Sequence, residues 1–337
     1  MKAIRIHETG GPEVLRLEEI KKPRPSAGQV LIKVAAAGVN YADIMQREGT
    51  YLTPTKLPTT LGLEVAGTVE ELGEGVSWPP VGTRVAALVE GGYAEYVLAY
   101  PHLIIPIPET LDFVHAAAFP LQGVTAYQLL HECAHLQPGE SVLVHAAAGG
   151  VGTLAVQLAR LMGAGKVIGT ASTEEKLEFA RSLGADVTIN YTQGAWVDQV
   201  LAATEGKGVD IILEMVGGEI GKKNLQCLAP FGRMPIYGAT SGKMSVDGFL
   251  QWEWTQFTGV ELMYKNQTVT GYWLTEWVKS RPDSLAVASK KLMQFLASGQ
   301  IKIIVGLTFP LEEAANAHRA LAERKTKGKV VLIVESR

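Results

Sequence analysis

A glycine-rich stretch near the middle of the chain has the composition of a phosphate-binding turn. Residues 146–152 read AAAGGVG. Glycine lets the backbone bend sharply and lets a pyrophosphate approach it closely, and the N–H groups at the start of a helix point at such an anion. On composition alone, the stretch is either a dinucleotide-binding turn or a tight strand–helix turn without a ligand.

The elements on either side of this stretch favour the dinucleotide site. The apolar run at 141–145 predicts a buried parallel strand. From Val151 to Met162, apolar residues recur at three- and four-residue spacing, which predicts an amphipathic helix. A strand, a glycine-rich turn and a helix in this order form the start of a dinucleotide-binding βαβ unit.

The same stretch indicates which dinucleotide is favoured. A fold selective for NAD usually has Asp or Glu at the end of its second strand, about twenty residues past the glycines. Here that position falls near 170–172, where Ser172 leaves room for a phosphate and Lys176 supplies a positive charge one turn later. Glu174 and Glu175 argue mildly against a phosphate, unless they face solvent or cap the helix. On the residues alone, Lys176 is either such a cation or an ordinary solvated helix residue, so the missing acid favours NADPH over NADH without deciding between them.

The rest of the chain predicts two domains of different architecture. Residues 1 to about 120 contain short strands separated by frequent glycine and proline, which predicts a barrel or a sandwich. From about 122, helices and strands alternate, which predicts a parallel sheet covered on both faces. After a helix near 283–297, strands return at 303–309 and 329–334, and we read this tail as part of the first domain.

Composition excludes several classes of protein. The net charge of −3 offers no basic footprint for nucleic acid, and no apolar run is long enough to span a membrane. The chain starts directly with a strand and shows no signal-peptide core. The two cysteines, Cys133 and Cys227, form neither a disulfide framework nor a metal cluster. We expect a cytoplasmic protein.

Taken together, these features resemble the medium-chain dehydrogenase/reductase superfamily, and within it the zinc-independent quinone oxidoreductases, or zeta-crystallin-like group. The resemblance covers essentially the whole chain. It is carried by AAAGGVG at 146–152, AGVNYAD at 37–43, QGVTAY at 122–127, INY at 189–191 and the closing segment from Ala317 to Lys329. It implies an α/β fold, with a GroES-like catalytic domain at 1–121 and 299–337 and an NADPH-binding Rossmann domain at 122–298.

The resemblance also implies a set of cofactor contacts. The pyrophosphate is expected on Ala148, Gly149, Gly150 and Val151, and the 2′-phosphate on Ser172, Lys176, Tyr191 and Arg324. Gly238 and Ala239 follow the fifth strand, at the crevice where such sheets bind ligands. The nicotinamide is expected beside Asn40, Tyr51, Thr125, Gly271, Tyr272 and Trp273. For Tyr272 and Trp273 the alternative is packing in the core.

The chain departs from the zinc alcohol dehydrogenases of the same superfamily. Where they have a cysteine after Ala-Gly-Val, this chain has Asn40 and Tyr41. Where they have Gly-His-Glu, it has Gly62, Leu63 and Glu64, and leucine cannot bind zinc. Their structural zinc lobe needs four closely spaced cysteines, and this chain has two in total. We predict no metal site, and we read four histidines as surface or helix-end residues: His115, His131, His135 and His145.

Hydride transfer requires the protein mainly to orient and desolvate two reactants. We expect a metal-free site in the cleft between the domains, where Asn40 donates a hydrogen bond to the acceptor oxygen as an oxyanion-hole donor does. Tyr41 and Tyr51 are further candidate donors, and Asp43 is a candidate positioning residue. The alternative for Asn40 and Asp43 is a turn or a helix cap.

The sequence therefore predicts an NADPH-dependent, zinc-independent quinone reductase. Reduction of the carbon–carbon double bond of an enone or alkenal is an alternative. A non-catalytic protein that binds NADPH, as a crystallin or an RNA-binding protein does, is another. The expected partners are a small-molecule quinone or enone and a second copy of the chain, with no nucleic acid and no membrane. Four tryptophans shape an acceptor pocket, a subunit contact or a local core: Trp252, Trp254, Trp273 and Trp277.

Overall fold

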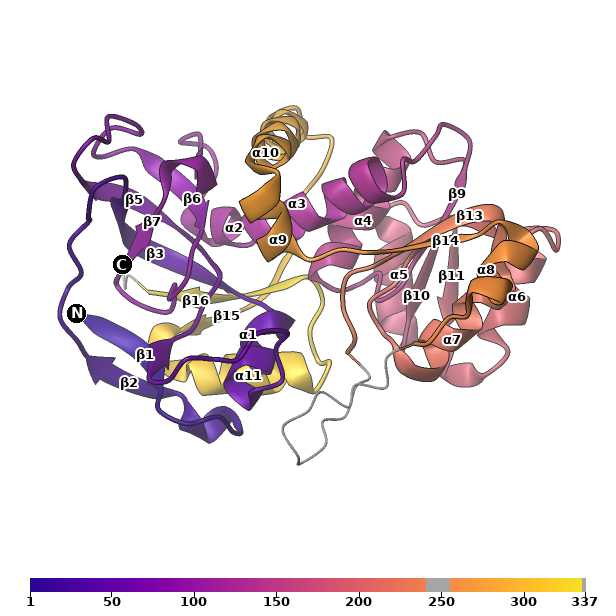
Figure 1. The fold of residues 1–337 in the computed structure, drawn as a ribbon, viewed down its shortest axis with the longest axis horizontal. Coiled ribbons are helices and arrows are strands. Elements are labelled where there is room, and N and C mark those ends of the chain that lie inside the picture. Colours follow the sequence, from indigo (N-terminus) through magenta and orange to yellow (C-terminus); the bar gives the residue numbers. More distant parts are fainter. Residues whose placement is uncertain (241–254, 335–337) are drawn as a thin grey trace. The chain divides into compact units, whose positions relative to one another are not determined.

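The computed structural model describes residues 1–240 and 255–334, which fall into two compact units (Figure 1). Unit 1 comprises Met1–Gln122 and Ile303–Arg337, and unit 2 comprises Gly123–Lys302. Trp252 and Trp254 lie outside the described residues. None of the described helices combines the length and apolar character that crossing a bilayer requires.

Unit 1 is built mainly on antiparallel strands. A seven-stranded sheet has the order β15-β16-β3-β5-β6-β8, with β7 also paired to β3, and a three-stranded sheet has the order β2-β1-β4. The strands are β1 (Lys2–Ile6), β2 (Arg16–Glu19), β3 (Val30–Val39), β4 (Thr59–Thr60), β5 (Glu64–Leu72), β6 (Arg84–Leu88), β7 (Tyr96–Ala99), β8 (Ile104–Pro106), β15 (Val305–Pro310) and β16 (Lys329–Ile333). Because β16 pairs with β3, the C-terminal segment is part of this unit.

Short helices complete unit 1. They are η1 (Pro12–Val14), α1 (Tyr41–Glu48), η2 (Pro101–Leu103), α2 (Phe113–Ala117), η5 (Leu311–Glu313) and α11 (Ala314–Ala322). Helix α1 is not among the elements that hydrophobic periodicity predicts, because Ile44 is the one apolar side chain that it buries. Its start is marked instead by Asn40 at the N-cap position and Asp43 three residues later.

Unit 2 contains the predicted parallel sheet, which the structure confirms (Figure 1). Its six strands have the order β11-β10-β9-β12-β13-β14, and every pair is parallel. The strands are β9 (Ser141–Val144), β10 (Lys166–Ala171), β11 (Val187–Asn190), β12 (Val209–Leu213), β13 (Leu228–Ile236) and β14 (Thr268–Gly271). From β9 the chain order runs outward in both directions, so the topological switch point lies between β9 and β12.

The helices of unit 2 follow the strands in the expected alternation. They are α4 (Gly150–Leu161), α5 (Glu174–Ser182), η4 (Tyr191–Gln193), α6 (Trp196–Ala203), α7 (Gly218–Cys227), α8 (Gly259–Lys265), α9 (Leu274–Ser280) and α10 (Pro282–Ala297). Two more helical elements precede β9 in the chain. Helix α3 (Pro120–Gln128) begins at a proline, which suits a first helical turn, and continues as the short π-helix η3 (Leu129–Cys133).

Candidate functional site

The glycine-rich turn follows β9 and leads directly into α4. Ala146, with φ of +49°, makes the sharp bend in the left-handed region. The Gly149 N–H donates to Ala146 O at 2.8 Å, and the Ala147 N–H donates to Thr170 O at 3.0 Å, which ties the turn to β10. Gly149 is the N-cap of α4, and its φ of −82° is an ordinary extended value.

Close packing explains the glycine at position 152. A Cβ atom on Gly152 would lie 2.2 Å from Ala146 O and 2.8 Å from Ala147 Cα. The first turn of α4 therefore lies against the backbone of the bend, closer than any side chain permits. Gly152 is needed because it lets the helix come close to the bend, and not because it adopts an unusual backbone angle.

The start of α4 fits a pyrophosphate. The Thr153 N–H is bonded to Gly149 O at 2.9 Å, and in an α-helix the amides before that bond have no partner within the helix. Within α4, the first turn contains no acidic residue, so the dipole of this 12-residue helix is not opposed there. The donors that can hold an anion are the backbone N–H groups of Gly150, Val151 and Gly152.

The end of β10 fits a phosphate rather than a ribose hydroxyl. In the parallel register of β10 and β11, Ala171 lies opposite Asn190, so Ser172 and Tyr191 are the residues that directly follow the two paired strand ends. Asn190 Nδ2 donates to Ser172 O at 3.4 Å. Thr173 caps α5 by accepting the Lys176 N–H at 3.4 Å, so Lys176 stands in the first turn of that helix.

One of the two glutamates that argued against a phosphate is engaged elsewhere. Arg181 Nη1 lies 3.0 Å from Glu174 Oε1, two turns along α5. This pairing draws the Glu174 carboxylate along the helix surface. The residues that follow β10 and β11 therefore supply the hydroxyl of Ser172, the phenol of Tyr191 and the cation of Lys176. Position 172 itself carries no acidic side chain.

The remaining predicted residues of unit 2 lie in three places: Gly238 and Ala239 follow β13, Gly271 ends β14 with Tyr272 and Trp273 directly after it, and Thr125 is in α3. Gly238 approaches Met215, because a Cβ on the glycine would lie 3.4 Å from Met215 O. Tyr272 is 7% exposed, and its hydroxyl donates to Gln128 Oε1 at 2.7 Å. Burial raises the pKa of the Tyr272 hydroxyl well above its usual range, and a hydrogen bond with Thr125 acts in the opposite direction. The structure thus brings Thr125 and Tyr272 together.

The remaining aromatic residues of this region lie close to Tyr272. The ring of Trp277 lies 5.9 Å from that of Tyr272, and the guanidinium of Arg281 lies 5.1 Å from the Trp277 ring. Trp273 is the N-cap of α9. These contacts show Tyr272 and Trp277 in a local aromatic cluster, which was one of the predicted alternatives.

The candidate catalytic residues Asn40 and Tyr41 begin α1 in unit 1. Asn40 is 4% exposed, its Nδ2 donates to Glu64 Oε1 at 3.0 Å, and its Oδ1 accepts from Lys329 Nζ at 2.6 Å. The Asp43 carboxylate accepts the Asn40 backbone N–H at 2.7 Å, so the helix-cap reading holds for Asp43.

The other predicted residues of unit 1 lie near α1. Burial raises the pKa of the Tyr41 hydroxyl, Glu48 adds to the rise, and the positive charge of Arg324 acts in the opposite direction. Arg324 follows α11 with φ of +56°, and Tyr51 lies in the partly exposed segment after α1.

A buried hydrogen-bonded chain continues from Asp43, and nothing in local sequence predicts it. The Tyr93 hydroxyl donates to Asp43 Oδ2 at 2.9 Å and lies 3.2 Å from His318 Nε2, while Arg47 Nη1 lies 3.3 Å from His318 Nδ1. Burial raises the pKa of Asp43 to about 6. Burial and the nearby Arg47 lower the pKa of His318 to about 3.

Glu64, the last residue of the Gly62–Glu64 stretch that stands in place of Gly-His-Glu, forms a buried ion pair with Lys329. Glu64 accepts from Lys329 Nζ, from Asn40 Nδ2 and from the Leu121 N–H at 2.8 Å, so an ammonium group occupies the neighbourhood of its carboxylate. Across the described part of the chain, no three side chains of His, Cys, Asp or Glu come together as a group that could hold a metal ion.

One of the four histidines differs from its predicted position. His145 is fully buried rather than at a surface, and its ring contacts Thr170 and Asn224. The prediction was wrong because a histidine that directly follows a buried strand lies beneath the turn, where polar partners from other strands satisfy it. The other three lie at exposed or half-buried positions: His115, His131 and His135.

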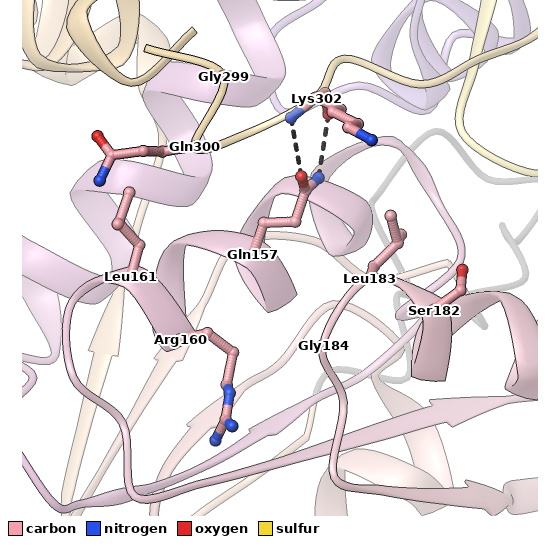
Figure 2. A pocket seen from close by; sticks show the side chains of 9 residues that line it. All are labelled: Gln157, Arg160, Leu161, Ser182, Leu183, Gly184, Gly299, Gln300 and Lys302. Carbon is pink, nitrogen blue, oxygen red and sulfur yellow. Dashed lines mark hydrogen bonds between the residues drawn. The ribbon is translucent and has the colours of Figure 1, made fainter.

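Unit 2 carries a groove of about 440 Å³ (Figure 2). Its lining comes from the second half of α4, the end of α5 and the segment after α10, and includes none of the predicted cofactor residues. Gln157 joins two of these walls, since its Nε2 donates to Lys302 O at 3.0 Å and its Oε1 accepts the Lys302 N–H at 2.8 Å (Figure 2). The glycine-rich turn is at the opposite end of α4.

Two family models match the chain. The model described as alcohol dehydrogenase GroES-like domain matches residues 26–109, and the one described as zinc-binding dehydrogenase matches residues 150–290. A quinone oxidoreductase of Lama guanicoe is 38% identical over 339 residues, which is 99% of this chain and 98% of the relative. A 2-haloacrylate reductase of a Burkholderia species is 38% identical and covers 98% of both chains.

Solved structures agree with the sequence comparison. The quinone oxidoreductase of Escherichia coli, described as complexed with NADPH, superposes with a TM-score of 0.91 at 34% identity. The match covers 99% of this chain and 100% of that one. The likeness therefore extends over both units rather than over the parallel sheet alone.

Proposed function

We propose that this chain, which belongs to the quinone oxidoreductase family of the medium-chain dehydrogenase/reductase superfamily, binds NADPH and reduces a conjugated carbonyl compound such as a quinone. The end of β10 carries the choice of NADPH, because Ser172, Tyr191 and Lys176 offer a hydroxyl, a phenol and a cation where an NAD-binding chain has a carboxylate. The NADPH complex of the Escherichia coli relative supports the same choice.

We propose that residues of unit 2 contact successive parts of the cofactor. The backbone N–H groups of Gly150 and Val151 would hold the pyrophosphate, together with the Ala148–Gly149 segment that precedes them. Gly238 and Ala239 would line the next part of the crevice, and Gly271, Tyr272, Trp273 and Thr125 the part beyond it. NADPH supplies the hydride when bound, so the protein needs no redox group of its own.

The residues of unit 1 complete the proposal. Asn40 is proposed to contact the acceptor or the nicotinamide through Nδ2, because its Oδ1 accepts from Lys329. One Nδ2 hydrogen already bonds Glu64 Oε1 at 3.0 Å, and the other has only a long contact of 3.5 Å to Gly38 O, which is the bond that a ligand would replace. A cation on Oδ1 polarises the amide and makes its N–H groups better donors. Tyr41 and Tyr51 are the proposed additional donors, and Arg324 the proposed second cation on the 2′-phosphate.

Reduction of an activated carbon–carbon double bond is the second candidate. The 2-haloacrylate reductase, at 38% identity over the same length, specifically favours it. A quinone and an α,β-unsaturated carbonyl compound both accept hydride at an electron-poor conjugated carbon. The same cofactor site therefore serves either reaction, and the shape of the acceptor pocket makes the choice.

An acceptor panel tests the proposal. The loss of NADPH absorbance is followed with phenanthrenequinone, benzoquinone, a simple enone and 2-chloroacrylate, with NADH as the matched coenzyme control. Faster turnover with a quinone, and with NADPH over NADH, is the expected result. Faster turnover with the enone or the haloacrylate establishes the second candidate instead. Tight NADPH binding without turnover of any acceptor overturns both and favours a non-catalytic NADPH-binding protein.

Assembly and location are also proposals. We propose a homodimer in the cytoplasm that acts on a small-molecule substrate, as expected from the resemblance. Light scattering on the purified protein, with and without NADPH, measures the mass in solution. A monomeric mass at working concentration contradicts the dimer.

A further inference from the structure

Four fully buried polar side chains lie beneath the glycine-rich turn, at the topological switch point of the sheet in unit 2. His145 directly follows β9, Glu214 directly follows β12, Thr170 is in β10 and Asn224 is in α7. All four are 0% exposed. The indole of Trp196 covers the His145 ring edge-on, with centroids 5.5 Å apart. Neither the hydride transfer nor the phosphate contacts described above use these side chains.

The hydrogen bonds of this cluster run in one direction. Asn224 Nδ2 donates to Glu214 Oε2, which leaves Asn224 Oδ1 as an acceptor. His145 Nε2 lies 2.8 Å from that oxygen and therefore carries a hydrogen. His145 Nδ1 lies 3.0 Å from the Thr170 hydroxyl, which can donate to it. Each group thus donates to the next, from Thr170 through His145 and Asn224 to the carboxylate.

The carboxylate at the end of this chain anchors a second loop. Glu214 Oε1 accepts the N–H groups of Val216 and Gly217, each at 2.6 Å. The preceding residue, Met215, accepts the Thr240 N–H on its carbonyl oxygen at 3.1 Å and packs against Gly238. The loop after β12 is therefore fixed to the loop after β13, where cofactor contacts are proposed.

The other end of the chain is fixed to the glycine-rich turn. His145 is joined covalently to Ala146, the residue that makes the bend, and Thr170 O accepts the Ala147 N–H at 3.0 Å. The cluster therefore connects the turn proposed to bind the pyrophosphate with the loop after β12 and, through that loop, with the loop after β13, where Gly238 and Ala239 are proposed cofactor contacts. Glu214 therefore accepts three hydrogen bonds, two from backbone amides and one from Asn224.

We propose that Thr170, His145, Asn224 and Glu214 are positioning residues that hold these loops in register for the dinucleotide. The inference rests on the proposed NADPH site. If the inference holds, the affinity for the cofactor depends on which group donates and which accepts in each of these hydrogen bonds. The volume of the side chains alone is then not enough.

Exchanging the two ends of the Asn224–Glu214 bond tests that requirement. Glu214→Gln places an amide donor against the Asn224 donor, and Asn224→Asp places two carboxylates together. Each single variant is expected to raise the Kd for NADPH and for NADH by about tenfold, because a buried group loses its partner. The double variant restores a donor facing a carboxylate, and its Kd is expected within about threefold of wild type. Binding is measured by calorimetry and folding by thermal melting.

A matched control uses the same two strands at their opposite ends. Ser141 N and Oγ donate to Asp210 Oδ2 at 2.8 and 2.7 Å, joining the amino ends of β9 and β12. Asp210→Ala is expected to lower the melting temperature while the Kd for NADPH stays within about threefold of wild type. Thr170→Val, which removes one hydroxyl at constant shape, serves if the Glu214 variants fail to fold, and is expected to raise the Kd about threefold.

The outcomes separate this inference from the proposed function. Wild-type protein that binds NADPH, with single variants that bind it equally well, overturns the positioning role alone. The same holds if the double variant is no better than the single ones, or if Asp210→Ala weakens binding as much as they do. Wild-type protein without affinity for NADPH overturns the proposed function and this inference with it.

Discussion

Lys329 Nζ donates a hydrogen bond to Asn40 Oδ1 at 2.6 Å, although the two residues are 289 positions apart in the chain. The same ammonium forms an ion pair with Glu64, and both charged side chains are at most 1% exposed. Burial lowers the pKa of Lys329, and the Glu64 carboxylate acts against that shift. The last strand of the protein thus sets the orientation of the amide at the start of α1.

Removing the ammonium group of Lys329 is expected to destabilise the protein strongly. Lys329→Met leaves Glu64 as a buried carboxylate without its cation, which costs about 3–5 kcal/mol of unfolding free energy in such pairs. Urea unfolding measures the loss. The additional change Glu64→Leu is expected to recover most of it, because no unpaired charge then remains buried.

An exposed lysine provides the control for that experiment. Lys325 pairs with Glu323 at the surface, with side chains 71% and 51% exposed. Lys325→Met is expected to change stability by less than about 1 kcal/mol, as surface pairs do. Equal losses of unfolding free energy for the two lysine substitutions would show that the buried pair contributes no more to stability than a surface pair.

Lys176→Ala is expected to weaken the binding of NADPH much more than that of NADH. A charge-assisted hydrogen bond to the 2′-phosphate contributes about 1.5–3 kcal/mol, which corresponds to roughly a 10- to 150-fold rise in Kd. NADH has no phosphate there, so its Kd is expected to change less than about threefold. The control is Lys207→Ala, which removes a surface cation paired with Glu205 before β12. Equal losses for the two coenzymes would contradict the phosphate assignment.

Gly152→Ala is expected to lower both stability and NADPH affinity. The new methyl group would lie 2.2 Å from Ala146 O, so the helix must move away from the bend. Overpacking of this kind costs about 1–3 kcal/mol. Gly259→Ala, in open space at the start of α8, is the matched control and is expected to be nearly neutral. Thermal melting and calorimetry follow both variants, and unchanged NADPH binding by Gly152→Ala would contradict the close approach.

His318 is expected to make the protein sensitive to acid. Its pKa falls from 6.5 to about 3 on folding, so the unfolded chain binds a proton over that interval and the folded chain does not. The stability contribution is complete above about pH 6.5 and is lost as the pH falls toward 3, at no more than about 1.4 kcal/mol per pH unit. His318→Gln is expected to flatten this slope between about pH 6.5 and 4.

The Asp43 carboxyl changes the stability with pH in the opposite direction to His318. It is present both in wild type and in His318→Gln. The pKa of Asp43 is raised to about 6, so its ionisation costs stability as the pH rises from about 3.8. Comparing His318→Gln with wild type at each pH therefore isolates the histidine. His7→Gln, at an exposed histidine paired with Glu18, is the control. Parallel stability curves for wild type and His318→Gln would contradict the buried neutral imidazole.

The parallel sheet of unit 2 and its glycine-rich turn were predictable because their signals are local. The apolar run that ends at His145 predicts a strand, and the three- and four-residue spacing from Val151 predicts a helix. Both signals lie within about twenty residues. The missing acid at Ser172 is equally local. Helix α1 escaped prediction because one buried apolar residue, Ile44, leaves no periodic signal.

The polar interior was decided only by the tertiary structure. His145 reads as a helix-end residue until β10, β12 and α7 place Thr170, Glu214 and Asn224 around it. Asn40 reads as a cap or a donor until β16, from the far end of the chain, brings Lys329 to its Oδ1. Local periodicity indicates which face of an element is buried. The partner of a buried polar group depends instead on the order of the strands in the sheet, and no short window of sequence contains that order.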